Sequence, residues 1–177
     1  MLKTMKNVIL IGMPGTGKST VGVLLAKRLG YRFVDTDLLI IERAGKTLPQ
    51  ILTETGVERF LTLEAEIGET LRCDKTVIAT GGSMVFGQTA MKRLKENAIT
   101  LWLDTPLPVL EKRILAAADR GIAAEPGMSI AQIDSIRRPL YTQYADIRIS
   151  CEGAVESIVN SIVSAIGQWE QEHKPIG

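Results

Sequence analysis

The sequence predicts a three-layer α/β/α fold, in which a five-stranded parallel sheet lies between two layers of helices. Short β-like runs alternate along the chain with stretches of helical periodicity. Strands joined through helices of this length need crossover connections, which produce a parallel sheet covered on both faces. The 177 residues, 45% of them hydrophobic, are enough for one buried core. We therefore expect a single domain over residues 1–177.

The individual elements are predicted from local pattern. Strands are expected where short apolar runs end at turn residues, and helices where apolar residues recur with a helical period. The expected strands are 8–11, 32–34, 76–79, 99–103 and 147–149, and the expected helices cover about 20–28, 48–54, 57–72, 88–96, 106–117, 130–143 and 154–169.

A glycine-rich loop follows the first expected strand. Residues 12–20 read Gly-Met-Pro-Gly-Thr-Gly-Lys-Ser-Thr, which is a complete G-x-x-x-x-G-K-[ST] phosphate-binding motif between a strand and a helix. Its backbone N–H groups and the helix N-terminus favour a bound phosphate. The sequence therefore predicts a nucleoside triphosphate site. The residues expected to bind the nucleotide here are Gly12, Gly15, Thr16, Gly17, Lys18, Ser19 and Thr20.

Two aspartates close the second expected strand, in Asp35-Thr36-Asp37. Ligands of parallel α/β sheets bind beyond the carboxyl ends of the strands, so both carboxylates are expected beside the phosphate loop. One can hold Mg²⁺ through water, and the other can orient or deprotonate an acceptor hydroxyl. A simpler interpretation is that either aspartate caps the next helix, from Leu38 onward.

Three further features fall near the same edge of the sheet. Thr80-Gly81-Gly82-Ser83 follows the third strand, where paired glycines allow a ligand to approach the backbone, although an ordinary turn explains them equally well. Arginines match planar oxyanions, and of Arg137 and Arg138 only one needs to face inward. Arg113 can stack on adenine or remain solvated.

The loosest stretch of the chain, about residues 118–130, contains Arg120, two glycines and a proline. In a protein with a phosphate loop we interpret it as a mobile lid over the nucleotide. Residues from about 170 to 177 are expected to form a frayed helix end and a tail.

Composition excludes several other classes of function. The formal net charge is +1 and aromatic residues make up 5% of the chain, so neither a strong field nor a stacking surface recruits nucleic acid. No apolar segment is long enough for a membrane span or a secretory signal. Cys73 and Cys151 are interpreted as reduced structural thiols, and a metal role for His173 is not expected. We expect a cytoplasmic monomer whose partners are ATP and a small molecule.

Taken together, these motifs resemble the shikimate kinase family. The phosphate loop, Asp-x-Asp, T-G-G and R-x-P-L-Y occur in that order and at close to the family's spacing, over about residues 5–165. The resemblance implies a P-loop NTPase fold with strand order 2-3-1-4-5 and a mobile lid, and an activity in which ATP phosphorylates a hydroxyl of shikimate.

The resemblance also implies roles for individual residues. Lys18 and Ser19 would serve the phosphates and Mg²⁺, with Asp35 in the outer shell of the metal. Asp37 would contact the acceptor hydroxyl as base or orienting group. Arg120 would reach the transferred phosphoryl group, Arg137 would bind the acceptor carboxylate beside Gly81 and Gly82, and Arg113 would lie beside adenine.

Three positions depart from the family pattern. The family has Gly-Glu-x-x-Phe-Arg where this chain has Gly56-Val57-Glu58-Arg59-Phe60-Leu61, so leucine replaces an arginine that clamps the carboxylate. Arg59, two residues earlier, is about 200° away around a helix. Ser83 replaces the third glycine of a Gly-Gly-Gly run, and the R-P-L-L lid sequence has become Arg-Gly-Ile-Ala at residues 120–123.

These departures leave the acceptor open. Shikimate competes with a related polyol, hydroxy acid or amino alcohol. The motifs are also compatible with a nucleotide-dependent switch, a kinase fold that has lost catalysis, or a nucleoside monophosphate kinase. A guanine-reading switch is disfavoured because the chain contains no N-K-x-D sequence.

Overall fold

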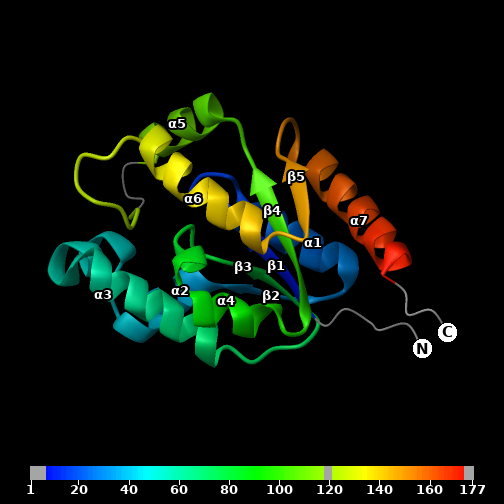
Figure 1. Cartoon of the computed structure of the whole chain (residues 1–177), viewed down its shortest axis with the longest axis horizontal. Helices are drawn as coiled ribbons and strands as arrows, with labels where there is room; N and C mark the ends of the chain where they lie inside the picture. Colours follow the sequence, from blue (N-terminus) through cyan, green and yellow to red (C-terminus); the bar gives the residue numbers. More distant parts are fainter. Residues whose placement is uncertain (1–6, 118–120, 174–177) are drawn as a thin grey trace.

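A computed structural model describes residues 7–117 and 121–173 of the chain. Its centre is a five-stranded parallel sheet, as the sequence pattern predicts, with the order β2-β3-β1-β4-β5 that the family resemblance implies (Figure 1). The strands are β1 (Asn7–Ile11), β2 (Arg32–Asp35), β3 (Thr76–Ala79), β4 (Ala98–Asp104) and β5 (Ile147–Ser150).

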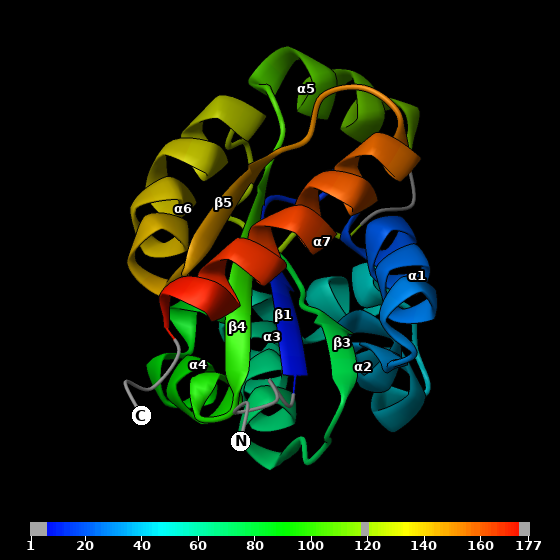
Figure 2. The same ribbon diagram turned by 90° about the vertical axis from the view of Figure 1, so that its right-hand side faces the viewer.

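Helices connect the strands and cover both faces of the sheet (Figures 1 and 2). They are α1 (Lys18–Leu29), α2 (Thr36–Ala44), α3 (Leu48–Thr70), α4 (Gln88–Lys95), α5 (Leu107–Ala116), α6 (Ile130–Tyr144) and α7 (Val155–Glu172), with a 3₁₀ turn, η1 (Met84–Phe86), before α4.

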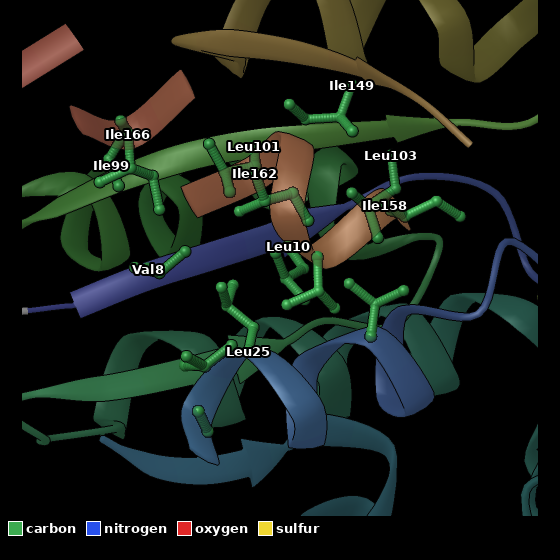
Figure 3. Packing of buried hydrophobic residues seen from close by; sticks show 14 of the residues in the cluster. Val8, Leu10, Leu25, Ile99, Leu101, Leu103, Ile149, Ile158, Ile162 and Ile166 are labelled. Carbon is green, nitrogen blue, oxygen red and sulfur yellow. The ribbon is translucent and has the colours of Figure 1, made fainter. Parts of the chain in front are cut away.

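The apolar core has two parts, one on each face of the sheet. In β1, Val8 and Leu10 pack against α1 and α7, whereas Ile9 and Ile11 face the opposite cluster that α4 and α6 complete. This alternation follows from the two-residue period of a strand. Figure 3 shows the first cluster, in which Leu25 of α1 and Ile162 of α7 approach the sheet. The central strand is therefore fixed from both sides, which gives the loop that follows it a rigid base.

A third, smaller cluster joins α2 and α3 away from the sheet. It contains Ile40, Ile51 and Phe60, together with Ala123 from the loop before α6. Helix α3 begins with a capping box between Thr47 and Gln50. Gly56 interrupts this helix with φ 78° and ψ 171°, so the two segments expected at 48–54 and 57–72 are both present and meet at this kink.

Helix α2 is not among the helices expected from periodicity, but the capping interpretation of Asp35 and Asp37 includes a helix from Leu38 onward, which is present. It begins at Thr36, directly after β2, with Asp35 as its N-cap. The run Leu38-Leu39-Ile40-Ile41 is apolar without a clear period, so its sequence does not distinguish a buried strand from a helix.

The remaining differences lie at the ends of elements. Helix α1 begins at Lys18 rather than at residue 20, and α7 continues to Glu172, so the tail expected from about residue 170 is still helical there. The described part of the expected lid, residues 121–129, is a loop. Arg120 lies outside the described residues. No described helix has the length and apolar run that a membrane crossing requires.

Candidate active site

The phosphate loop leaves β1 through a backbone conformation that requires glycine. Gly12 has φ 146°, and a β-carbon there would lie 2.5 Å from the carbonyl oxygen of Leu103 in the neighbouring strand. Gly17 has φ 91° and forms the N-cap of α1. Such left-handed conformations are accessible to glycine and strained for other residues. The loop therefore ends at the N-terminus of a helix, where the backbone N–H groups and the helix dipole favour an anion.

Lys18 places its ammonium group inside this loop. Its Nζ donates to the carbonyl oxygens of Gly12, at 2.7 Å, and Met13, at 2.8 Å. Thr16 donates to the same Met13 oxygen at 2.9 Å, so its side chain braces the loop. Lys18 is buried, yet it also borders the pocket described below. The positive charge is thus held where a bound phosphate would lie.

Ser19 and Asp35 meet beside the loop. The Ser19 hydroxyl donates to Oδ2 of Asp35 at 2.5 Å, while Oδ1 of Asp35 accepts from the backbone N–H of Asp37 at 2.9 Å. Asp35 therefore does cap α2, as the simpler interpretation of the sequence allows. The same carboxylate also touches the serine of the phosphate motif, so capping and a place beside the nucleotide site are compatible.

Arg113 of α5 lies against the loop from the other side. Its Nη1 donates to the carbonyl oxygen of Gly15 at 3.1 Å. The guanidinium therefore supports the loop backbone in this structure.

The acceptor side of the site is built where β2 and β3 end. The backbone N–H of Gly81 donates to the Thr36 hydroxyl at 3.0 Å, and Tyr141 donates to the Gly82 carbonyl at 2.7 Å. A β-carbon on Gly81 would lie 2.7 Å from Oδ1 of Asp37. The absence of a side chain at Gly81 therefore leaves room for the Asp37 carboxylate beside the backbone.

The structure separates the two adjacent arginines of α6. Arg137 is 2% exposed, lines the pocket, and donates through Nη2 to the Ala123 carbonyl at 2.7 Å. Arg138 instead forms ion pairs with Asp104 and Asp134, at 3.2 Å and 3.1 Å. Arg137 is therefore the arginine that faces inward.

One pocket of about 240 Å³ joins the phosphate side to the acceptor side. Its described lining includes Gly15, Gly17, Lys18, Ser19, Thr20, Asp37, Gly82, Ser83 and Arg137. Gly12, Thr16, Asp35, Gly81 and Arg113 lie behind this lining and hold it in place through the contacts given above. Gly121, Ile122 and Ala123 border the pocket from the loop before α6, and a β-carbon on Gly121 would lie 2.9 Å from the Pro49 nitrogen.

The motifs in the sequence do not single out Glu64, which also lines this pocket. Glu64 is 1% exposed, and its Oε2 accepts a hydrogen bond from the Ser83 hydroxyl at 2.5 Å. Burial, with a smaller contribution from the Asp37 carboxylate, raises the pKa of Glu64 to about 8 against the opposing effects of Ser83, Arg137 and Lys18. The sequence does contain a signal that Glu64 is buried. Its spacing places it on the same helix face as the apolar residues Phe60 and Ile67.

The departures at residues 59 and 61 have clear structural consequences. Arg59 pairs with Glu66 at 3.4 Å and is not part of the pocket lining, so it does not replace the missing arginine. Leu61 lines a separate apolar pocket with Val57, Phe86 and Ala123, next to Arg137. In the described residues, Arg137 is thus the only arginine that borders the acceptor side.

The two cysteines are unpaired, and Cys151 is buried. Burial is the main cause that raises the pKa of the Cys151 thiol, to about 11. His173 stacks on Trp169 with ring centroids 4.2 Å apart. None of these three residues is part of the described pocket lining.

A phosphate loop with its lysine, an Asp-x-Asp pair and an inward arginine around one pocket define a P-loop kinase. Comparisons with known proteins agree with this class. The family model "Shikimate kinase" matches residues 14–167. A shikimate kinase of Persephonella marina is 40% identical over 92% of this chain and 99% of its own length. The chain belongs to the shikimate kinase family.

Solved structures give the same relationship. A shikimate kinase from Acinetobacter baumannii, solved in complex with shikimate, superposes with a TM-score of 0.85 at 31% identity, covering 94% of this chain and 96% of that one. The shikimate kinase of Aquifex aeolicus gives a TM-score of 0.78 at 31% identity, covering 91% and 96%. A gluconokinase from Sinorhizobium meliloti, at 18% identity and a TM-score of 0.59, covers 95% of each chain and shares the fold alone. The chain is thus an ATP-dependent kinase by family.

Proposed function

We propose that this enzyme transfers the γ-phosphoryl group of ATP to a hydroxyl group of shikimate. The observation that carries the proposal is the single pocket in which Lys18, Asp37 and Arg137 converge. These side chains supply a cation for the phosphates, a carboxylate for the hydroxyl and a guanidinium for a carboxylate. Membership of the shikimate kinase family supports shikimate as the acceptor.

On the nucleotide side, we assign phosphate binding to the loop amides from Gly12 to Gly17, together with Lys18 and Thr20. The Lys18 ammonium would offset the charge that develops as the bond from the γ-phosphorus to its bridging oxygen breaks. Arg113 is assigned to the adenine side. Arg120 is assigned to the transferred phosphoryl group on the resemblance alone, since it lies outside the described residues.

Ser19 and Asp35 fit a magnesium site. Their side-chain oxygens are 2.5 Å apart beside the loop, and Mg²⁺ prefers oxygen donors and keeps several waters. A site with two protein oxygen donors leaves the other positions of the ion to nucleotide phosphates and water. Mg²⁺ in this place would neutralise charge on the phosphate oxygens.

On the acceptor side, we assign Asp37 to orient the reacting hydroxyl and to accept its proton as the oxygen attacks the γ-phosphorus. Arg137 would bind the carboxylate of shikimate, and the backbone at Gly81 and Gly82 would contact the ring. Because all these residues come from one chain, we propose that the enzyme works as a monomer with residues 1–177 as one domain.

An acceptor panel tests the function. ADP formation is measured with ATP and Mg²⁺ in the presence of shikimate, quinate, gluconate, homoserine or a nucleoside monophosphate. We expect saturable turnover with shikimate and far lower kcat/KM with the others. Preferred turnover of a different acceptor would contradict the assignment of the substrate. ADP formation that no acceptor stimulates would contradict phosphoryl transfer and favour a nucleotide-dependent switch.

A further inference from the structure

A buried carboxyl group with one unused oxygen faces the acceptor side of the pocket. Glu64 is 1% exposed, and its Oε2 is occupied by the hydrogen bond from Ser83. Its other oxygen, Oε1, is buried and has no hydrogen-bond partner in the described part of the chain. A buried polar atom without a partner costs free energy, so such an atom inside a substrate pocket indicates a place for a ligand group.

The surroundings of Glu64 favour its uncharged form. An isolated carboxylate in a buried site is strongly penalised, and the nearest like charge, Asp37, adds repulsion. Lys18 of α1 and Arg137 of α6 favour the charged form, as does the hydrogen bond from Ser83, but burial outweighs them and the pKa is about 8. Tyr141 faces the same group from α6 and is itself neutral, because burial raises its pKa. At neutral pH the carboxyl group is therefore mostly protonated.

Ser83 engages one oxygen of this carboxyl group. With the Ser83 hydroxyl donating to Oε2, the neutral group carries its proton on Oε1. A β-carbon on Gly81 would be 2.0 Å from this Oε1 and 2.7 Å from Oδ1 of Asp37. The O–H group of Glu64 is thus held over Gly81, on the same side as the carboxylate assigned to the acceptor hydroxyl.

The substitution at Leu61 is consistent with a neutral Glu64. Residues three apart on a helix are neighbours, so an arginine at position 61 would stand next to Glu64 and favour its ionised form. Leu61 instead borders the apolar pocket with Phe86 and Ala123. Position 61 therefore supplies no charged donor, and the neighbouring carboxyl group of Glu64 is neutral and able to donate.

We propose that Glu64, positioned by Ser83, is an acceptor-binding residue that donates a hydrogen bond from Oε1–H to a shikimate oxygen and replaces one donor of the absent arginine. Glu64 is the binding residue in this proposal, and Ser83 is a positioning residue that acts through it. The inference deepens the proposed function and rests on it for the identity of the acceptor.

The first test compares side chains at position 64 at pH 7. Glu64→Gln keeps the shape and a donor, so its KM for shikimate should stay within about threefold of wild type. Glu64→Ala removes the donor, and its KM should rise about tenfold. The KM for ATP should not change in either variant, and circular dichroism checks folding. An unchanged KM for shikimate in a folded Glu64→Ala enzyme would overturn the proposal.

The second test uses pH. Ionisation of Glu64 removes its donor and adds a negative charge, so the wild-type KM for shikimate should rise above about pH 8, whereas Glu64→Gln should show no such rise. In Ser83→Ala the rise should move to higher pH, because the lost hydrogen bond favoured the ionised form, and KM at pH 7 should increase a few-fold. An identical alkaline rise in wild type and Glu64→Gln would contradict the assignment.

A measurement without substrate separates this inference from the proposed function. Carbon-13 NMR of wild type labelled at glutamate carboxyls, with Glu64→Gln to assign the resonance, follows the titration of Glu64 directly. We expect a midpoint near pH 8. A midpoint near the ordinary glutamate value would overturn the neutral carboxyl donor even if shikimate is phosphorylated. Absence of shikimate turnover together with the expected midpoint would reject shikimate as the ligand of Glu64.

Discussion

The phosphate side and the acceptor side of the pocket differ in how they are built. On the phosphate side, anion binding depends on main-chain amides, the φ angles of glycines and the N-terminus of α1. On the acceptor side, side chains from α2, α3 and α6 converge on the turn after β3. The first side retains the whole motif, whereas the second has leucine and serine at positions where the family has arginine and glycine.

This difference shows which part of a kinase pocket can change by single substitutions. The loop geometry is shared among several residues, so no single side chain alters it without disturbing the turn as a whole. On the acceptor side, Asp37 and Arg137 each act through one side chain, so one substitution there removes one contact. We therefore expect chemistry to depend on the phosphate side and affinity for the acceptor to depend on the other.

The largest effect is expected for Lys18→Ala. Removal of the loop cation should lower kcat by about 10³-fold, because the positive charge acts on the transferred phosphoryl group. The KM for shikimate should change little. Lys27→Ala, on the exposed part of α1, is the matched control. Comparable kcat values for Lys18→Ala and wild type, measured by ADP release, would show that phosphoryl transfer does not depend on the Lys18 ammonium group.

The next effect is expected for Arg137→Met, which keeps much of the buried volume. Loss of the guanidinium should raise the KM for shikimate about 10- to 100-fold, since a charged hydrogen bond contributes about 1.5–3 kcal/mol. The KM for ATP should stay near wild type. Arg138→Met, which removes only the pairs with Asp104 and Asp134, is the control. Equal KM values for the two variants would contradict the inward role of Arg137.

Leu61→Arg should act in the opposite direction. A second guanidinium beside Arg137 should lower the KM for shikimate about tenfold. Leu61→Met, which keeps the apolar contacts near Phe86, should leave KM unchanged. An unaltered or higher KM in Leu61→Arg would mean that the acceptor side has been rebuilt around leucine and that one arginine is sufficient.

The smallest effect is expected for Arg113→Met. Arg113 donates to the Gly15 carbonyl from an exposed position on α5, so its loss should raise the KM for ATP a few-fold. Lys112→Met, on the same helix, is the control. Calorimetric titration with ADP measures the difference directly. A change in the KM for shikimate larger than that for ATP would be inconsistent with a role on the nucleotide side.

Much of the fold could be predicted because its signals are local. The five strands and the break in α3 near Gly56 agree with the expectations from local pattern, whereas the strand order is the one that the family resemblance implies. Helix α2 could not be separated from a strand, because four consecutive apolar residues fit both. The ends of α1 and α7 depend on capping and packing that periodicity does not specify.

The two sides of the candidate site are predictable from sequence to different extents. The phosphate motif is contiguous, so its residues are visible in one line of sequence. Glu64 and Ser83 lie 19 residues apart, and nothing local shows that a carboxyl group on α3 faces a turn after β3. The inward position of Arg137 rather than Arg138 likewise depends on the tertiary contact with Ala123.

The central claim is that one pocket joins an ATP phosphate site to a site for shikimate. Phosphorus-31 NMR of the enzyme with ATP, Mg²⁺ and shikimate tests it most directly. We expect a phosphomonoester signal that grows at the rate at which ADP appears with wild type and is nearly absent with Lys18→Ala. ADP that appears only with inorganic phosphate, or no ADP at all, would contradict the claim.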